Sequence, residues 1–367
     1  MKILELTNFS SGICGVWTRV KQESLELSKK GHDVRIFSSN ATKGSSEIAA
    51  CDDSLGKIKI KRFSFKKLGG ESFMSWKFEE EAIKFNPDIM IVHGYRHLHT
   101  TRALKLAKKL NCKIFLVTHA PFIESNSTRS FLSKLTVNFY DKFIGPKKIN
   151  QFDKVIAITN WEIPYLMKLG CNKEKITYIP NGIPEEFFKE KILLFKSKKI
   201  IFLGRISPIK GLETLIKAAS LIPQMQIEII GPSEGNYGAD LKSISPKNVK
   251  FIRPIYDLKL KIKKLQEADI FVLPSNREAM PQSLIEALSL GKIVISSSTQ
   301  GGKEIITNKK TGFLFEIGNE HDLAEKINFC LSKENSEIIK QIQINSRKKS
   351  EEFRWSKLIE KLESLFS

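Results

Sequence analysis

Short apolar runs of strand length alternate with helix-length segments along almost the whole chain, in two successive series. Alternating strands and helices joined by short loops predict parallel sheets that carry helices on both faces. Because the pattern restarts near residue 199, we expect an α/β protein with two doubly wound, Rossmann-like domains. The predicted strands are residues 3–6, 34–38, 89–92, 114–117, 155–158 and 175–179, followed by 199–203, 227–230, 249–252, 269–273 and 292–296.

The stretch that separates the two series has the composition of a linker. The chain of 367 residues is long enough for two domains with substantial cores. Pro180-Asn-Gly-Ile-Pro184 is typical of a turn, and residues 185–198 are charged and poorly patterned. We therefore expect an N-terminal domain at residues 1–180 and a C-terminal domain at 181–350. Residues 351–367 predict a terminal helix with many large apolar side chains, which must pack on another part of the protein.

Composition and cysteine usage are typical of a globular protein of a reducing compartment. Hydrophobic residues make up 41% and charged residues 27% of the chain, and no apolar stretch approaches the ~20 residues of a membrane span. Glu5 interrupts the apolar N-terminus, which disfavours a signal peptide. The five cysteines are scattered, odd in number and form no CxxC pair, which disfavours both a disulfide framework and a zinc site. We expect a cytoplasmic protein.

The formal net charge of +20 raises the question of an anionic partner. Basic residues interleaved with aromatic ones favour contact with an anionic membrane, although a lysine-rich solvated surface has the same composition. No nucleic-acid motif accompanies the charge, so we expect no nucleic-acid partner. The interleaved residues are Lys57, Lys59, Lys61, Arg62, Phe63, Phe65, Lys66, Lys67, Phe73 and Trp76.

Two glutamates flank the start of a predicted helix in the second series. Glu278 lies in a loop directly after the apolar run 269–274, and Glu286 lies one turn into the helix predicted for residues 282–290. Ligands of open α/β sheets bind at the carboxyl ends of strands, and a helix N-terminus offers free N–H groups to an anion. Two carboxylates for hydroxyl groups and a helix N-terminus for phosphate together suit a sugar nucleotide.

A second group of charged residues follows the strand at 199–203. Arg205 and Lys210 lie in a loop between this strand and a helix that begins near Gly211. Preorganised cations stabilise the charge that develops on a departing diphosphate. A surface pair of basic residues in a basic protein is the alternative interpretation.

In order and spacing, these segments resemble the retaining glycosyltransferases of family 4, whose GT-B fold has two Rossmann-like domains that face each other across a cleft. The resemblance covers nearly the whole chain. In the GT-B fold, the C-terminal helix crosses back to the N-terminal domain. The resemblance therefore implies the same for residues 351–367. The matching segments are Gly204-Arg205…Lys210-Gly211, the E-x7-E motif Glu278…Glu286, Ile179-Pro-Asn-Gly-Ile183, Gly301-Gly302-x-Glu304-Ile-Ile306, Gly312-Phe-Leu and Phe353-Arg-Trp355.

The resemblance implies a role for each matching residue of the C-terminal domain. Arg205 and Lys210 would bind the pyrophosphate of the donor. Glu286 would hold the ribose diol of the nucleotide, and Glu278 would bind hydroxyl groups of the transferred sugar. The amides around three further residues would contact the sugar and the phosphate, although Pro281 between them lacks an N–H. These residues are Met280, Gln282 and Ser283.

The N-terminal domain departs further from the family pattern. The family carries a Gly-Gly-Val loop sixteen residues before a Gly-His-x-Val segment; here Gly15 matches its second glycine, but Cys14 replaces the first. Gly12 could supply the flexibility of the missing glycine. His119 matches the family histidine beside the anomeric centre, and His93 matches a second histidine at a strand end, nearer the acceptor. A hydrogen-bonded structural imidazole is the alternative for both.

No metal or cofactor is expected. His93, His97 and His99 have no nearby carboxylate in the sequence and make a poor zinc signature. The chain has no D-x-D motif, and two cations already serve the leaving group. The resemblance further implies a front-face substitution, in which the donor phosphate takes the proton of the acceptor.

The expected function is the metal-independent transfer of a sugar, with retention, from a UDP- or GDP-sugar to a saccharide or lipid-linked acceptor, in the assembly of glycans at the inner face of the membrane. A non-catalytic sugar-nucleotide-binding subunit of a membrane-bound complex is the alternative. A 2-epimerase would need acid and base groups that the sequence does not offer. A nicotinamide dehydrogenase is disfavoured because Gly231-x3-Gly235-x2-Gly238 is not the G-x-G-x-x-G fingerprint.

Overall fold

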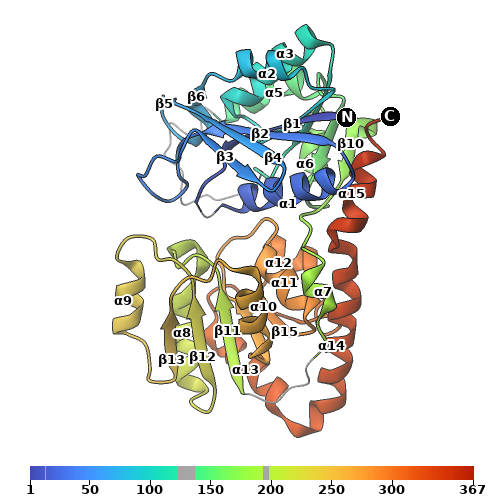
Figure 1. The fold of residues 1–367 in the computed structure, drawn as a ribbon. Coiled ribbons are helices and arrows are strands. Elements are labelled where there is room, and N and C mark those ends of the chain that lie inside the picture. Colours follow the sequence, from blue (N-terminus) through green and yellow to red (C-terminus); the bar gives the residue numbers. More distant parts are fainter. Residues whose placement is uncertain (13, 123–136, 193–197) are drawn as a thin grey trace. The chain divides into compact units, whose positions relative to one another are not determined.

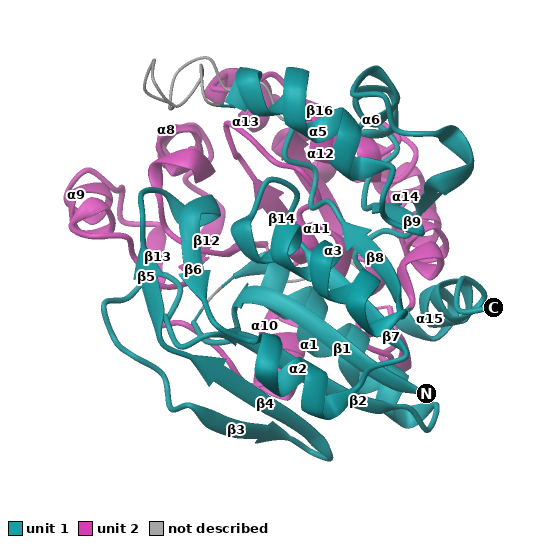
Figure 2. Ribbon diagram, turned by 90° about the horizontal axis from the view of Figure 1, so that it is seen from above, with its two compact units in different colours: residues 1–182, 355–367 teal, residues 183–354 magenta. Residues whose placement is uncertain are grey.

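The computed structural model describes residues 1–12, 14–122, 137–192 and 198–367, and these form two compact units. Unit 1 comprises residues 1–182 and 355–367, and unit 2 comprises residues 183–354 (Figures 1 and 2). The sequence placed the first boundary at residue 180, two residues before the end of the first segment of unit 1. It placed the start of the terminal helix at residue 351, whereas unit 2 continues to Arg354.

Unit 1 is built on an eight-stranded sheet with the order β10-β9-β8-β7-β1-β2-β4-β3. Every neighbouring pair is parallel except β3 and β4. The chain leaves β1 toward β2 and β4 and then returns to β7 on the other side of β1. The strand order therefore reverses between β1 and β7. The strands are β1 (Lys2–Phe9), β2 (Asp33–Ser39), β3 (Asp52–Leu55), β4 (Ile58–Phe63), β7 (Ile89–His93), β8 (Lys113–Val117), β9 (Lys154–Ala157) and β10 (Ile176–Tyr178).

Helices lie on both faces of this sheet (Figure 1). A two-stranded hairpin of β5 (Phe65–Lys67) and β6 (Met74–Trp76) packs beside α3. The C-terminal α15 packs on α1, and its Trp355 ring donates from Nε1 to Oε1 of Gln22 at 2.7 Å. The helices are α1 (Gly15–Lys29), α2 (Glu79–Phe85), α3 (Leu98–Leu110), α5 (Gly145–Ile149), α6 (Ile163–Lys168) and α15 (Trp355–Glu363), with a π-helical turn at Tyr140–Ile144 before α5.

Unit 2 is built on a six-stranded parallel sheet with the order β13-β12-β11-β14-β15-β16. In this doubly wound order, β11, β12 and β13 follow one another toward one edge of the sheet. The chain then returns to β14 on the other side of β11, so the strand order reverses between β11 and β14. The strands are β11 (Lys199–Leu203), β12 (Gln226–Ile230), β13 (Val249–Ile252), β14 (Ile270–Leu273), β15 (Ile293–Ser297) and β16 (Phe313–Phe315).

The helices of unit 2 begin with side-chain caps at several positions. Asp257 accepts from the N–H of Leu260 at the start of α10, and Asn319 accepts from the N–H of Asp322 at the start of α13. Helix α8 packs against α13, and α11 packs against α14. The helices are α7 (Glu186–Lys189), α8 (Leu212–Leu221), α9 (Tyr237–Ser243), α10 (Leu258–Gln266), α11 (Gln282–Ser289), α12 (Gln300–Ile305), α13 (Glu320–Leu331) and α14 (Ser336–Ser350).

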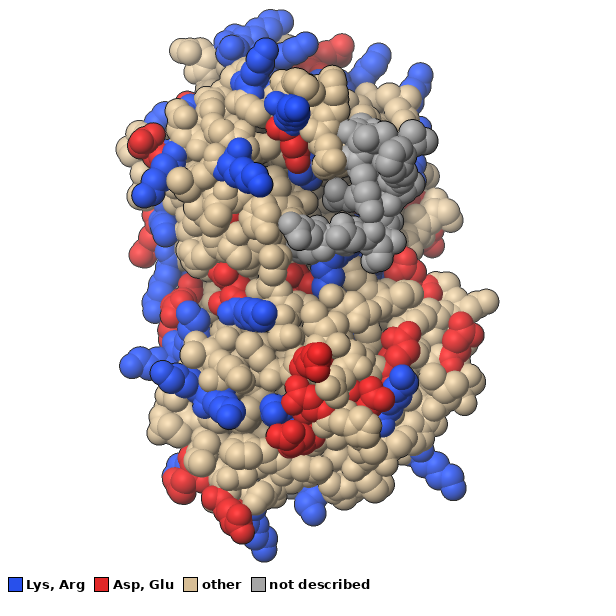
Figure 3. Space-filling view, turned by 180° about the vertical axis from the view of Figure 1, so that it is seen from behind, with Lys and Arg blue, Asp and Glu red and all other residues tan. Residues whose placement is uncertain are grey.

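The basic and aromatic residues between 57 and 76 are divided between the interior and the surface of unit 1. Strand β4 alternates, so its apolar side chains point into the core while Lys59 is exposed. Arg62 is buried and donates to Ser10 and Asp53, and Trp76 is 1% exposed. On the face drawn in Figure 3, the Lys and Arg side chains of unit 1 are spread among uncharged residues.

Two expectations drawn from composition can be compared with the coordinates. Each of the five cysteines is a free thiol. In the described part of the chain, no helix combines the length and the apolar character needed to cross a membrane.

Candidate active site

In unit 2, two loops meet where the strand order reverses. One loop follows β11 and the other follows β14, and both strands end at the same edge of the parallel sheet. The N–H of Asn276 donates to the carbonyl of Ile209 at 2.9 Å, which joins the loops directly. Gly211 permits this approach, because its φ is +58° and a Cβ atom there would lie 2.5 Å from the carbonyl oxygen of Pro274. The predicted donor residues therefore lie at the position where open α/β sheets bind ligands.

Lys210 and Glu278, which the sequence assigned to different groups, are direct partners. Nζ of Lys210 lies 2.5 Å from Oε1 of Glu278, and Oγ of Ser275 donates to the same oxygen at 2.6 Å. Both charged side chains are largely buried, with exposed fractions of 19% and 10%. Because both contacts involve Oε1, Oε2 of Glu278 takes part in neither. The pair thus places a fixed cation and a carboxylate oxygen side by side at the strand ends.

Arg205 is more loosely held than Lys210. Its side chain is 40% exposed, and its guanidinium lies 3.8 Å from a carboxylate oxygen of Glu234. The loop around it is fixed by backbone bonds, since Ile206 exchanges hydrogen bonds with Pro232 and Glu234 after β12. The guanidinium is therefore accessible to an anion, at the same strand-end edge as Lys210.

Glu286 lies on α11 and is 2% exposed. Its Oε1 is 2.6 Å from Nζ of Lys261 on α10, an ion pair that the sequence did not reveal. Its Oε2 is buried and has no hydrogen-bond partner among the described residues. A buried carboxylate oxygen without a donor is costly unless a ligand supplies one. Hydroxyl groups such as those of a ribose are donors of the required kind.

The remaining predicted donor residues lie at the start of α11. Helix α11 begins at Gln282, directly after Pro281, and Ser283 follows in its first turn. Met280 is buried, whereas Gln282 and Ser283 are partly exposed. The first-turn N–H groups of a helix have no partner within the helix, so this end suits a phosphate group.

In unit 1, the loop after β1 leads into α1 at the strand-order reversal. Gly15 is the first residue of α1, and Cys14 occupies the N-cap position without a side-chain cap hydrogen bond. A Cβ atom at Gly15 would meet no atom of the described residues within 4 Å. The glycine that the fold requires is Gly12, whose φ is +81° and whose Cβ atom would lie 2.2 Å from the carbonyl oxygen of Lys43. Gly12 thus allows the close packing of this loop against the backbone of Lys43.

The two predicted histidines form a hydrogen-bonded chain with a glutamate. Nδ1 of His93 lies 2.9 Å from Nε2 of His119, and Nε2 of His93 lies 2.6 Å from Oε2 of Glu5. His93 ends β7 and Glu5 lies on the neighbouring β1. Burial raises the pKa of Glu5 to about 8 and lowers the pKa of His93 to about 3. At neutral pH, His93 is therefore neutral, and burial disfavours the charged form of Glu5.

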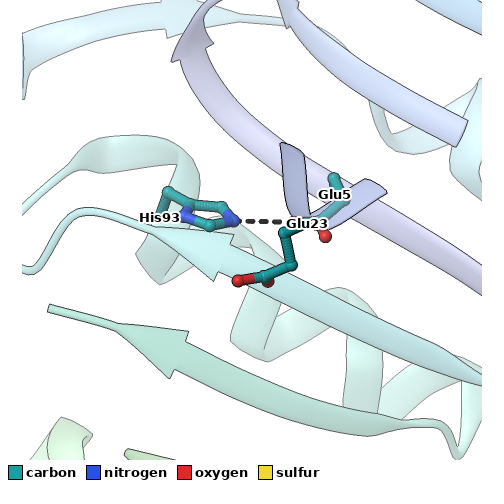
Figure 4. A group of neighbouring side chains, drawn as sticks. All are labelled: Glu5, Glu23 and His93. Carbon is teal, nitrogen blue, oxygen red and sulfur yellow. Dashed lines mark hydrogen bonds and ion pairs between the residues drawn. The ribbon is translucent and has the colours of Figure 1, made fainter. Parts of the chain in front are cut away.

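Helix α1 places Glu23 beside Glu5 and His93 (Figure 4). Its Arg19 forms a buried ion pair with Glu23. Nη2 of Arg19 lies 2.9 Å from Oε2 of Glu23, and both side chains are fully buried. Arg19 also donates from Nη1 to the carbonyl oxygens of Ile179 and Pro180, each at 3.0 Å. Burial raises the pKa of Glu23, although the Arg19 charge opposes this rise. The Arg19 guanidinium thus offsets negative charge within this buried cluster.

Glu5, Glu23 and His93 are the residues with the spacing of a metal site in the described part of unit 1. Their ligand atoms all lie within 4.8 Å of one another. The Arg19 guanidinium already neutralises Glu23 at contact distance, and a divalent cation there would face that positive charge. The donor set therefore fits a proton-sharing cluster better than a metal.

His119 lies in a strained backbone segment at the edge of a small cavity. Its φ is +59° and that of Ala120 is +47°, a conformation that residues with a side chain adopt at an energetic cost. The cavity has a volume of about 180 Å³, and Cys14, His93, His97 and His119 are among the residues that line it. His119 is partly exposed, and burial together with His93 lowers its pKa well below the usual value. A neutral imidazole therefore faces this cavity.

The other histidines of this region are hydrogen-bonded structural groups. His99 is 1% exposed, and its Nε2 donates to the carbonyl oxygen of His93 at 3.0 Å. Nδ1 of His97 lies 2.7 Å from the amide nitrogen of Asn8. Glu162 also holds the segment beside His119, since it accepts from Oγ1 of Thr118 at 2.7 Å. Burial raises the pKa of Glu162 to about 7.

Models of known protein families match both units of the chain. The family model described as "Glycosyltransferase Family 4" matches residues 13–187, and the model described as "Glycosyl transferases group 1" matches residues 184–349. One relative is the N,N'-diacetylbacillosaminyl-diphospho-undecaprenol alpha-1,3-N-acetylgalactosaminyltransferase of Campylobacter jejuni, 27% identical over 208 residues. This alignment covers 55% of the chain and 54% of the relative, so the chain matches about half the length of that protein.

Solved structures match over the full chain. The sucrose-phosphate synthase of Thermosynechococcus elongatus has a TM-score of 0.78 at 18% identity, covering 100% of this chain and 98% of its own. The Anabaena protein HepE, solved in complex with UDP-glucose, has a TM-score of 0.72 at 18% identity, covering 99% and 98%. At this identity, the likeness concerns the fold. With family models matched along both units and this fold shared, the chain belongs to glycosyltransferase family 4 and is a glycosyltransferase of the GT-B fold.

Proposed function

We propose that this glycosyltransferase moves a sugar from a nucleoside-diphosphate sugar to a saccharide or lipid-linked acceptor, with retention and without a metal ion. The observation that carries the proposal is the strand-end site of unit 2. There Lys210 contacts Glu278, and Glu286 keeps a buried carboxylate oxygen that has no donor in the described part of the chain. A donor of this class offers a diphosphate for the cation, sugar hydroxyls for Glu278 and ribose hydroxyls for Glu286.

The charge that develops on the leaving group indicates which residues contribute most to catalysis. When the bond from the anomeric carbon to the diphosphate oxygen breaks, negative charge grows on that oxygen. Lys210, which is largely buried, and Arg205, at the same edge of the sheet, are suited to stabilise this charge. These two cations support metal independence, because they can perform the task that a divalent ion performs in metal-dependent enzymes.

The transfer step that we propose follows from the family resemblance. The acceptor hydroxyl attacks the anomeric carbon on the face that the diphosphate leaves, and its proton passes to the departing phosphate oxygen. One carbon–oxygen bond forms as the other breaks, so the products are the glycoside and the nucleoside diphosphate. In this step, Glu278 orients the sugar, and His119 of unit 1 is the residue assigned to the reacting centre.

Donor binding and turnover by the purified protein test the proposal. We expect the unfolding temperature to rise with one series among UDP-, GDP- and ADP-sugars, and the neighbour solved with UDP-glucose makes the uridine series the first choice. With the stabilising sugar, we expect release of the nucleoside diphosphate that is unchanged by EDTA. Product NMR should show the anomeric configuration of the donor.

Each outcome of this experiment has a defined meaning. Inversion of the anomeric centre would contradict retention, and loss of turnover in EDTA would contradict metal independence. A protein that binds a nucleotide sugar but neither hydrolyses nor transfers it would instead support the alternative of a non-catalytic subunit. The absence of any stabilising nucleotide sugar would remove the proposal.

A lipid-linked acceptor would bring the protein to a membrane surface. The Campylobacter relative carries diphospho-undecaprenol in its name, and the net charge of this chain is +20. Beside α5, Phe139 and Phe143 are 58% and 54% exposed, and their ring centroids are 5.1 Å apart. Nζ of Lys142 lies 5.4 Å from the Phe143 ring centroid. Exposed aromatic rings with adjacent lysines suit the interface of an anionic bilayer.

Vesicle flotation distinguishes membrane binding from a merely basic surface. We expect binding to anionic vesicles that weakens with salt, and little binding to neutral ones. Replacing Phe139 and Phe143 together by serine should weaken partitioning by at least about tenfold, because burial of one Phe side chain contributes roughly 1.5–3 kcal/mol. Ile48→Ser, at another exposed apolar residue of unit 1, is the matched control. Equal, negligible binding to both vesicle types would contradict a membrane contact.

A further inference from the structure

Unit 1 contains a second, larger cavity of about 400 Å³ that adjoins the cavity beside His119. Phe9 and Glu71 line both cavities, so the two meet at these residues. One wall of the larger cavity is the segment 41–46 after β2, and the other is formed by the hairpin of β5 and β6. This hairpin lies outside the eight-stranded sheet, so it is not needed to complete the sheet and can serve binding.

Both walls of the larger cavity are tied to β1 and the loop that follows it. The N–H of Lys43 donates to the carbonyl oxygen of Ser11 at 3.1 Å, beside the close backbone approach at Gly12. On the hairpin side, Nδ2 of Asn8 donates to the carbonyl oxygen of Glu71 at 2.8 Å. A cavity whose walls are already held in place loses little conformational entropy when a ligand enters it.

The floor of the larger cavity is apolar and partly aromatic. Phe9, Ala41 and Met74 are buried together in a small cluster of their own, and Phe65 packs against this cluster. Phe65 is only partly buried and lines the cavity, as do Phe9 and Met74. The C–H face of a pyranose ring is apolar and packs well on an aromatic side chain. An apolar floor with polar groups around it therefore suits a saccharide unit.

The charged residues that line the larger cavity are Lys43, Lys67 and Glu71. Lys43 forms an ion pair with Glu71, and their side chains are 23% and 49% exposed. Lys67 is exposed and has no ion-pair partner in the part of the chain that the structure describes. Two positive charges and one negative charge leave one positive charge uncompensated. A ligand that brings a single anionic group would complement it.

We infer that the acceptor is an anionic saccharide and that the larger cavity binds its sugar unit with a carboxylate or phosphate group. The ring of this unit packs on Phe65, and its anionic group lies against Lys67. The hydroxyl that is to be glycosylated extends past Phe9 and Glu71 into the cavity beside His119. The inference rests on the proposed function, because it names the acceptor class of the same transfer.

NMR titration with small saccharides tests the inference without any donor turnover. The probes are methyl glucuronide, N-acetylglucosamine 1-phosphate, neutral methyl glucoside and inorganic phosphate. All titrations use the Lys210→Ala background, which weakens competing binding of anions at the strand-end site of unit 2. We expect at least one of the two anionic sugars to bind about fivefold or more tightly than methyl glucoside, and salt to reduce this preference. The carboxylate and the phosphate sugar distinguish the two kinds of anionic group.

Substitutions with opposite expected effects place the ligand in this cavity. Lys67→Met should reduce the preference for the anionic sugar to less than about twofold. Lys66→Met is the matched control, because Lys66 is exposed on the same strand but does not line the cavity, as expected where neighbouring side chains point to opposite faces. Glu71→Gln removes the negative charge that pairs with Lys43, so the anionic sugar should bind about threefold more tightly. Phe65→Leu should weaken both kinds of sugar by about threefold and leave inorganic phosphate unaffected.

Failure of this inference differs from failure of the proposed function. If methyl glucoside binds as tightly as both anionic sugars, or if Lys67→Met and Lys66→Met change the preference equally, the inference is wrong. It is also wrong if inorganic phosphate binds as tightly as the preferred anionic sugar, because the cavity then holds an anion without recognising a saccharide. If the titrations behave as expected but no nucleotide sugar is turned over, the saccharide site is correct and the proposed function is wrong.

Discussion

Lys210→Ala is expected to lower turnover of the donor by about 100- to 1,000-fold, the range measured when one preorganised group is removed from a developing anion. Lys210 lies at the strand-order reversal of unit 2 and contacts Glu278 at 2.5 Å. The charge on the leaving group is largest in the transition state, so kcat should fall more than KM rises. Arg205→Ala should change activity in the same direction.

The control for Lys210→Ala removes an equal charge from the same unit. Lys217 is exposed on α8, and Lys217→Ala should leave kcat unchanged. Lys210→Ala should stay folded, because Ser275 still donates to Glu278; far-ultraviolet circular dichroism checks this. If the Arg205 and Lys210 variants are both fully active, the diphosphate does not bind at this loop.

The architecture of unit 2 followed closely from its sequence. The apolar runs of strand length became the predicted parallel strands, because a strand buried on both faces needs a continuous apolar run. The Lys210 loop and the Glu278 loop lie far apart in the chain, yet both follow strands and therefore meet at one edge of the sheet. The sequence predicted both loops without indicating that the two side chains would be ion-pair partners.

The groups that the sequence did not predict are buried charges that depend on tertiary packing. Lys261 is one of several lysines on α10, and no local pattern shows which of them turns toward Glu286. From the sequence alone, Glu5 provided only an argument against a signal peptide. Its contact with His93 forms only when β1 and β7 pair, and burial then raises its pKa. The contacts of His93 with Glu5 and His119 likewise could not be predicted from the sequence, and its place on the acceptor side stays a prediction.

At residues 57–76, by contrast, the sequence contained the relevant signal. Composition alone indicated one basic and aromatic surface, but the alternation of β4 divides its side chains between the core and the solvent. Ile58 and Ile60 already carried that period of two in the sequence. The signal for a strand was therefore present, and the density of lysines obscured it.

The largest effect on stability is expected for Arg19→Met. This change leaves Glu23 buried without its cation and removes the bonds to Ile179 and Pro180. Breaking one side of a buried ion pair typically costs about 3–5 kcal/mol. The four tryptophans, at positions 17, 76, 161 and 355, all belong to unit 1, so denaturant unfolding followed by tryptophan fluorescence reports on that unit.

A second substitution separates the buried charge from the lost packing. Arg19→Met combined with Glu23→Gln removes both members of the ion pair, so the double variant should recover a substantial part of the loss, about 1–3 kcal/mol. Lys21→Met, at an exposed lysine on the same helix, should stay within about 0.5 kcal/mol of the native protein. If Arg19→Met is equally mild, or if the double variant is no more stable than the single one, the Arg19–Glu23 pair does not hold the buried charge of α1.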